Sequence, residues 1–215
     1  MGLRGRLFAS LYDRLLASAE EAGFRARRQE LLRTAKGRVL EIGAGTGLNL
    51  PFYGSDVQLT VAEPEEPMAK RLAQRLREQR PNSELVHAPA EHLPFPDAQF
   101  DMVVSTLVLC TVADQARALR ELRRVLKPTG KLLFIEHVRS DDPKVARWQD
   151  RLNGVNRFIA YGCNCNRATL DAISSAGFKV AQLERDELRK APPIVRPLVV
   201  GVAQADAESG DAHPG

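Results

Sequence analysis

A glycine-rich run and an acidic residue that follows it carry the strongest chemical signal in the sequence. The run, residues 41–47, reads Glu-Ile-Gly-Ala-Gly-Thr-Gly and follows a short apolar segment. Glycine lacks a Cβ, so such a loop can turn tightly and bring its backbone against a ligand. Glu63 ends the next apolar segment, where a carboxylate can accept both hydroxyls of a ribose. These features predict a nucleoside-containing cofactor; a structural turn and a solvated strand-end acid are the simpler alternatives.

The spacing of the glycines distinguishes between two such cofactors. Dinucleotide-binding loops use G-x-G-x-x-G, which places a pyrophosphate on a helix N-terminus. The loop here has G-x-G-x-G, which favours S-adenosylmethionine, with Glu41 close to the cationic end of that molecule. The residues expected to bind the cofactor are Glu41, Gly43, Ala44, Gly45, Gly47, Glu63, Pro64, Ala90, Glu91 and Thr106.

The segments that position these residues alternate between buried strands and amphipathic helices, as in a mostly parallel sheet covered on both faces. We expect an α/β, Rossmann-like fold with a seven-stranded sheet whose last strand is antiparallel. The expected strands are 38–42, 57–62, 84–87, 100–106, 131–137, 179–184 and 198–205. Two helices are expected at 67–79 and 166–175. A third is expected in the helix-sized connection between the first two strands, and a fourth begins at the cap Asp114 and ends before residues 128–130.

The chain is expected to form one domain with additions at its ends. Residues 1–34 are predicted to form an amphipathic helical cap, with an apolar stripe at positions 3, 7, 11 and 15. This helix either packs across the mouth of the site or lies on a membrane surface. Residues 35–205 form the cofactor-binding domain, in which 139–165 is long enough to act as a substrate lid. Residues 206–215 are expected to be disordered.

Four motifs in chain order resemble the class I S-adenosylmethionine-dependent methyltransferases, across roughly residues 30–205. They are the glycine loop, Glu63, the stretch 89–95 (Pro-Ala-Glu-His-Leu-Pro-Phe) before Phe100-Asp101, and the stretch 126–130 (Leu-Lys-Pro-Thr-Gly). The third motif of that family usually begins with an Asp that contacts the adenine amino group, and here Pro89 takes its place. The resemblance therefore assigns adenine contact to the Ala90 backbone and to Glu91.

A narrower similarity is carried by residues 106–110 (Thr-Leu-Val-Leu-Cys), 135–138 (Ile-Glu-His-Val), Trp148-Gln149 and 162–164 (Gly-Cys-Asn). These resemble the methyltransferase-like proteins of animals that methylate thiols, and also bacterial quinone and phospholipid-headgroup methyltransferases. The resemblance implies a small-molecule acceptor, a thiol being one candidate, without fixing the methylated atom. The alternatives are a membrane-associated phospholipid or quinone methyltransferase, a non-catalytic cofactor-binding module and, more distantly, an NAD-dependent dehydrogenase.

The acceptor side of the site is expected at the carboxyl ends of the fourth and fifth strands. Methyl transfer mainly requires that the protein positions the acceptor and excludes water. A thiol must first become a thiolate, so His137 is the candidate base, with a hydrogen bond to backbone as its other role. Thr106 and Leu107 are expected to border the transferred methyl group. The residues expected to contact the acceptor are Tyr12, Trp148 and Tyr161.

Composition and charge exclude several other classes of protein. Hydrophobic residues make up 44% and charged residues 27% of the chain, as in a globular protein. No apolar run approaches the roughly 20 residues of a membrane span and no secretory signal is visible, so a cytoplasmic location is expected, with peripheral membrane contact as the alternative. The net charge of +4 comes without a dense basic run, so no nucleic-acid partner is expected.

The cysteines are not expected to bind a metal or to form a disulfide. Cys163 and Cys165 are too close for an easy disulfide, and their spacing does not suit a zinc site without further ligands. Cys110 is expected to be a small buried apolar residue.

Overall fold

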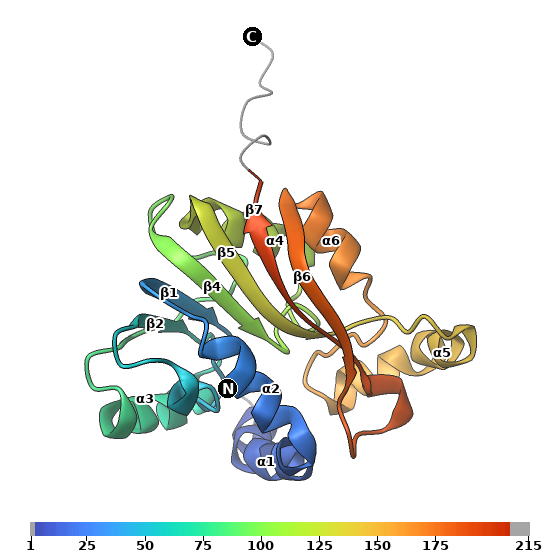
Figure 1. Cartoon of the computed structure of the whole chain (residues 1–215). Coiled ribbons are helices and arrows are strands. Elements are labelled where there is room, and N and C mark those ends of the chain that lie inside the picture. Colours follow the sequence, from blue (N-terminus) through green and yellow to red (C-terminus); the bar gives the residue numbers. More distant parts are fainter. Residues whose placement is uncertain (1–2, 207–215) are drawn as a thin grey trace.

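The computed structural model describes residues 3–206, and their side chains from residue 11 onward. Seven strands form one sheet in the order β3-β2-β1-β4-β5-β7-β6 (Figure 1). They are β1 (Arg38–Ile42), β2 (Gln58–Ala62), β3 (Glu84–Val86), β4 (Phe100–Thr106), β5 (Leu126–His137), β6 (Phe178–Glu187) and β7 (Pro197–Ala205). β7 pairs antiparallel with both β5 and β6, whereas β1 to β5 pair in parallel. The predicted Rossmann-like sheet is confirmed.

Six α-helices accompany this sheet in the described residues. They are α1 (Leu3–Ala19), α2 (Arg25–Leu32), α3 (Glu66–Gln79), α4 (Gln115–Val125), α5 (Pro143–Ile159) and α6 (Thr169–Ser175). The shorter elements are the π-helical segment η1 (Glu20–Phe24) and the 3₁₀ turns η2 (Leu50–Phe52) and η3 (Pro193–Val195). Asp114 caps α4 as predicted, because its carboxylate accepts the Arg117 backbone N–H at 2.9 Å. None of the described helices is both long and apolar enough to cross a bilayer.

Consecutive apolar residues along the strands supply two separate cores, one on each face of the sheet. On β5, Leu132 and Phe134 join one cluster, whereas Leu133 and Ile135 join the other. The first cluster includes residues of α4 and α6, and the second includes residues of α2 and α3. This two-sided burial explains why the strands are continuously apolar rather than alternating.

Figure 1 shows α1 and α5 beyond the edge of the sheet at which the parallel strands end. α1 joins α2 through η1, and α5 follows β5 after a short loop. Loops that follow parallel strands meet at this edge, where α/β sheets bind their ligands. The site is therefore expected between the sheet edge and these two helices.

The connection between β1 and β2 differs from the prediction. Residues 43–57 contain no α-helix and only the single 3₁₀ turn η2. Four glycines and Pro51 are spread through this segment, and both residue types disfavour an α-helix. The predicted helix is wrong here, so the glycine loop does not begin a helix.

Two further boundaries also shift. β5 begins at Leu126 and not at Lys131, because its pairing with β4 jumps from Phe100–Leu126 to Met102–Lys131. Residues 127–130 thus form an irregularity within the strand rather than a break before it. α6 begins at Thr169, later than predicted. The expected disordered tail lies outside the described residues except for Asp206.

Candidate active site

A cavity of about 660 Å³ lies at the carboxyl edge of the sheet. Its volume suits a cofactor together with a small acceptor, since ligand sites span roughly 300–1,000 Å³. The predicted site residues on its wall are Tyr12, Gly43, Gly45, Glu63, Pro64, Ala90, Glu91, Thr106, Leu107, His137 and Tyr161. Four others, Glu41, Ala44, Gly47 and Trp148, do not line it.

The glycine loop leaves its backbone bare at one end of this cavity. Gly43 and Gly45 have positive φ angles of 53° and 59°, a conformation that favours glycine. A Cβ added to Gly43 would stand 2.6 Å from Val108 Cγ2, so a side chain there would displace the loop after β4. The loop can therefore approach a ligand closely only because these positions are glycine.

Glu63 is buried beside this loop and is fixed by backbone donors. One carboxylate oxygen accepts the Gly45 N–H at 2.7 Å, and the other accepts the Glu65 N–H at 2.9 Å. Burial raises the pKa of Glu63. Each oxygen has a second lone pair, so the carboxylate can still accept ribose hydroxyls. The bare loop, the oriented acid and the cavity together fit S-adenosylmethionine.

Glu41 lies beneath the glycine loop and not beside the ligand. Its carboxylate accepts Asn49 Nδ2 at 2.9 Å and the Tyr53 hydroxyl at 2.8 Å. Burial raises its pKa to about 7. Asn49 also accepts Arg28 Nη1 at 2.8 Å, so a buried polar network joins α2 to the underside of the loop. In this structure Glu41 supports the loop rather than contacting the cavity.

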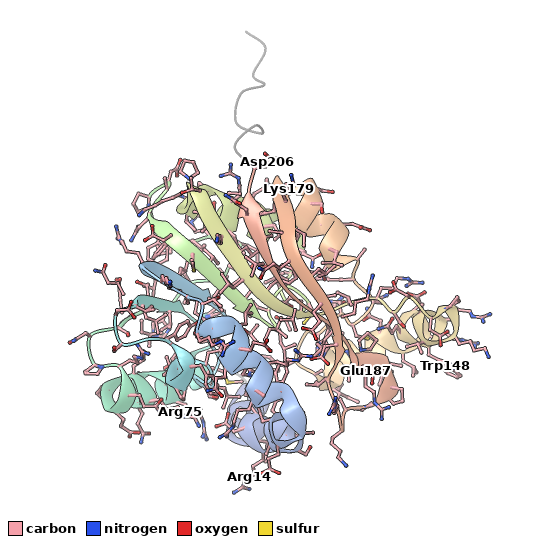
Figure 2. The ribbon with its side chains drawn as sticks, viewed as in Figure 1. Arg14, Arg75, Trp148, Lys179, Glu187 and Asp206 are labelled. Carbon is pink, nitrogen blue, oxygen red and sulfur yellow. The ribbon has the colours of Figure 1, made fainter. Side chains whose placement is uncertain are left out.

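A second polar cluster, which no sequence motif indicated, ties α1 to the glycine loop. Asp13 accepts the Thr46 hydroxyl at 2.6 Å and Arg75 Nη2 at 2.6 Å. Arg75, labelled in Figure 2, also donates to the Thr46 carbonyl oxygen at 2.9 Å. The ring of Tyr12 therefore lies over Gly45, and burial raises the pKa of Tyr12 to about 12. Nothing in the local sequence relates Asp13 to Arg75.

Glu91 lines the cavity but its carboxylate is engaged elsewhere. It accepts the backbone N–H groups of Ala113 at 2.7 Å and Asp114 at 3.3 Å, just before α4. The Arg117 guanidinium donates to the Glu91 carbonyl oxygen at 3.0 Å. Pro89 and Ala90 are the neighbouring wall residues. Glu91 thus anchors the loop that faces this part of the cavity.

Strained backbone positions occur on the wall of the cavity. Among residues 3–206, the non-glycine residues with positive φ are Ala98, Leu107, Tyr161 and Lys190, and all but Ala98 line the cavity. The Leu107 N–H donates to the Ile135 carbonyl oxygen at 2.8 Å, which holds this conformation beside Thr106. Such strain is often retained at functional sites.

His137 ends β5 at the same part of the wall and meets two thiols. Its Nδ1 lies 3.5 Å from Cys163 Sγ and 3.7 Å from Cys110 Sγ. The hydrogen bond between the two thiols lowers the pKa of Cys163, and the His137 imidazole lowers it further. The same hydrogen bond, together with burial, raises the pKa of Cys110. Cys110 is buried as predicted, but its neighbours were not foreseen.

The segment 139–165 contributes to the wall only through its last part. Tyr161 lies on the wall, and its hydroxyl donates to a Glu65 carboxylate oxygen at 3.0 Å. Trp148 is 54% exposed on the outer part of α5, away from the cavity (Figure 2). The loop between β6 and β7 supplies Lys190, Ala191 and Pro192 instead, which no sequence motif indicated.

Comparison with known proteins agrees with this architecture. Residues 40–134 match the methyltransferase domain family. Human thiol S-methyltransferase TMT1A is 32% identical over 200 residues, which cover 91% of this chain and 82% of the relative. A phosphatidylethanolamine N-methyltransferase from Cereibacter sphaeroides is 32% identical over 139 residues, covering 64% and 68%. The solved YcgJ protein from Bacillus subtilis aligns with a TM-score of 0.68 at 19% identity, covering 86% and 99%.

The sheet order, the glycine loop and the buried acid at the end of β2 define a Rossmann-like protein with a nucleoside cofactor. Together with its relatives, they show that the chain belongs to the S-adenosylmethionine-dependent methyltransferase family. The predicted cofactor and enzyme class are confirmed.

Proposed function

We propose that this methyltransferase acts on the thiol of a small, largely apolar molecule. The observation that carries this proposal is a continuous cavity that runs from the glycine loop to His137. When bound, S-adenosylmethionine supplies an electrophilic methyl group. His137 lies on the wall of the same cavity, at the sheet edge, where a thiol proton has to be removed. The name of the human relative, a thiol S-methyltransferase, supports this choice of acceptor.

The rest of the cavity wall supports an apolar acceptor. Much of the remaining wall is apolar, and its apolar members include Leu15, Leu16, Ala19, Met68, Leu107, Val108, Val112, Ile159 and Val195. Such a wall excludes water and binds a hydrocarbon body without hydrogen bonds. We further propose that α1 and residues 139–165 cover the bound acceptor, since both contribute residues to this wall.

A screen of matched acceptors tests this proposal. Aryl and alkyl thiols should yield S-adenosylhomocysteine, while their alcohol, amine and quinol counterparts should not. His137→Gln should lower kcat/KM for thiols by about 10²- to 10³-fold, because loss of the thiol proton depends on this imidazole, with cofactor affinity by calorimetry unchanged. Turnover of phosphatidylethanolamine or a quinol in preference to every thiol would contradict the proposal.

We also propose that the protein makes peripheral contact with a lipid surface, from which an apolar acceptor would enter the cavity. An apolar stripe is exposed on α5 at helical spacing, formed by Trp148, Leu152, Val155 and Ile159, with exposed fractions of 54%, 36%, 57% and 69%. Leu15 on α1 is 64% exposed, and both it and Ile159 also line the cavity. The exposed stripe is therefore continuous with the site, and α5 carries several basic residues that suit an anionic surface.

Vesicle flotation measures this contact. The full chain should float with vesicles that contain anionic lipid and less with neutral ones. Replacing both Trp148 and Val155 with glutamate should abolish flotation, whereas Leu183→Glu, an exposed apolar position on β6, should not. If the wild-type protein stays with the soluble fraction in both cases, the membrane proposal fails while the thiol proposal stands.

A further inference from the structure

Three potential metal ligands meet at the acceptor end of the cavity. Cys110 follows β4, His137 ends β5, and Cys163 follows α5. The two sulfurs and an imidazole nitrogen lie within 4.8 Å of one another, and all three residues are buried and line the cavity. Among the described residues, His137 Nδ1 has only the two sulfurs as polar neighbours and Nε2 has no partner.

The distances between these atoms match those within a tetrahedral zinc site. With Zn–S near 2.3 Å and Zn–N near 2.0–2.1 Å, tetrahedral ligands lie about 3.8 Å apart for two sulfurs and about 3.6 Å for sulfur and nitrogen. Here the two sulfurs are 3.8 Å apart, and they lie 3.5 Å and 3.7 Å from His137 Nδ1. The three pairwise distances therefore already match those around a bound zinc ion.

Other residues hold both cysteine loops in place. Glu136, buried beside His137, accepts the Cys110 N–H at 3.3 Å, and the Asn164 N–H donates to the Cys110 carbonyl oxygen at 2.8 Å. Asn156 Nδ2 donates to the Cys163 carbonyl oxygen at 2.8 Å. These bonds fix the backbone of both cysteines, and strand β5 fixes that of His137.

We propose that Cys110, His137 and Cys163 bind a thiophilic divalent cation, zinc, and leave its fourth coordination position open to the cavity. Two thiolates and a neutral imidazole give zinc a site of zero net charge, which suits its buried surroundings. Three protein ligands and one open position are typical of catalytic rather than structural zinc. The sequence predicts no metal site, because the spacing of Cys163 and Cys165 does not suit one. The ligands proposed here come from three segments that are far apart in the chain.

The role of this site rests on the proposed function. A thiol acceptor at the open position would give up its S–H proton to water as its sulfur donates an electron pair to the cation. The acceptor would then be held as a thiolate at neutral pH, next to Thr106 and Leu107. His137 cannot be both a ligand and the base through the same nitrogen, so zinc replaces it in that task.

Cobalt(II) titration of the reduced full-length protein tests the site. We expect one equivalent to bind, with a sulfur-to-cobalt charge-transfer band and the intense visible bands of tetrahedral coordination, and zinc to displace it. Cys110→Ser, Cys163→Ser and His137→Gln should each weaken binding by more than the about 10- to 100-fold that loss of an outer-sphere partner costs. Calorimetry with S-adenosylmethionine shows which variants remain folded. One folded variant of the three is enough to test the metal site.

Cys165→Ser is the matched control. Cys165 is fully buried and two residues from Cys163, but it is not part of the ligand cluster. It should bind cobalt as the wild type does. Absence of the charge-transfer band in the wild type, or an equal loss in Cys165→Ser, would overturn the metal site.

Activity after chelation separates this inference from the proposed function. Loss of thiol turnover on zinc removal, with recovery on zinc addition, supports the proposed role. Unchanged thiol turnover in metal-free protein would overturn that role and leave the thiol proposal intact. Stoichiometric metal binding without turnover of any thiol would support the site and overturn the proposed function.

Discussion

Glu63→Ala is expected to abolish measurable S-adenosylmethionine binding while the chain remains folded. The variant removes a buried carboxylate that can accept two ribose hydroxyls, and hydrogen bonds to a charged group contribute about 1.5–3 kcal/mol each. Two such bonds correspond to a loss of affinity of about 10²- to 10⁴-fold. Glu63 also fixes the Gly45 N–H at 2.7 Å, so the glycine loop loses its anchor. Isothermal titration with the cofactor and with S-adenosylhomocysteine measures the change.

Two further variants make this result specific. Glu63→Gln keeps one carbonyl acceptor and should bind with intermediate affinity. Glu84→Ala removes an exposed carboxylate from β3, outside the cavity, and should bind as the wild type does. An affinity of Glu63→Ala within threefold of the wild type would show that this acid does not hold the ribose.

Glu136→Ala is expected to cause a large loss of stability. Glu136 is fully buried, and its carboxylate accepts the Ser105 hydroxyl at 2.6 Å and the backbone N–H groups of Val108, Leu109 and Cys110 at 3.0–3.3 Å. Alanine leaves these donors buried without an acceptor, at a cost of about 1–3 kcal/mol for each that water does not reach. We expect the free energy of unfolding to fall by about 3–5 kcal/mol.

Denaturant unfolding followed by circular dichroism measures this loss. Glu136→Gln retains one carbonyl oxygen and should lose less than the alanine variant. Glu84→Ala serves again as the exposed control and should stay within about 0.5 kcal/mol of the wild type. If Glu136→Ala were equally stable, the loop after β4 would not depend on this carboxylate, and the placement of Cys110 would need another cause.

The sheet and the cofactor half of the site could be predicted because their signals are local. A buried strand appears as an apolar run, and the cap of α4 as Asp114 before an amphipathic segment. Parallel strands end at one edge of a sheet, so the loop after β1 and Glu63 after β2 had to lie close together. The order of strands along the chain was therefore enough to join these parts of the site.

The part of the cavity that we propose for the acceptor was decided by the tertiary structure. Cys163 reaches His137 only because the segment after α5 folds back to the sheet edge, and no periodicity or spacing encodes that path. Asp13 and Arg75 form an ion pair across two helices for the same reason. Helix α5 turns Trp148, a predicted acceptor contact, outward, so that it does not line the cavity. The sequence determined the strands, the glycine loop and the acid, whereas contacts between segments distant in the chain determined the packing of α1 over the loop, the Cys-His-Cys cluster and the apolar wall.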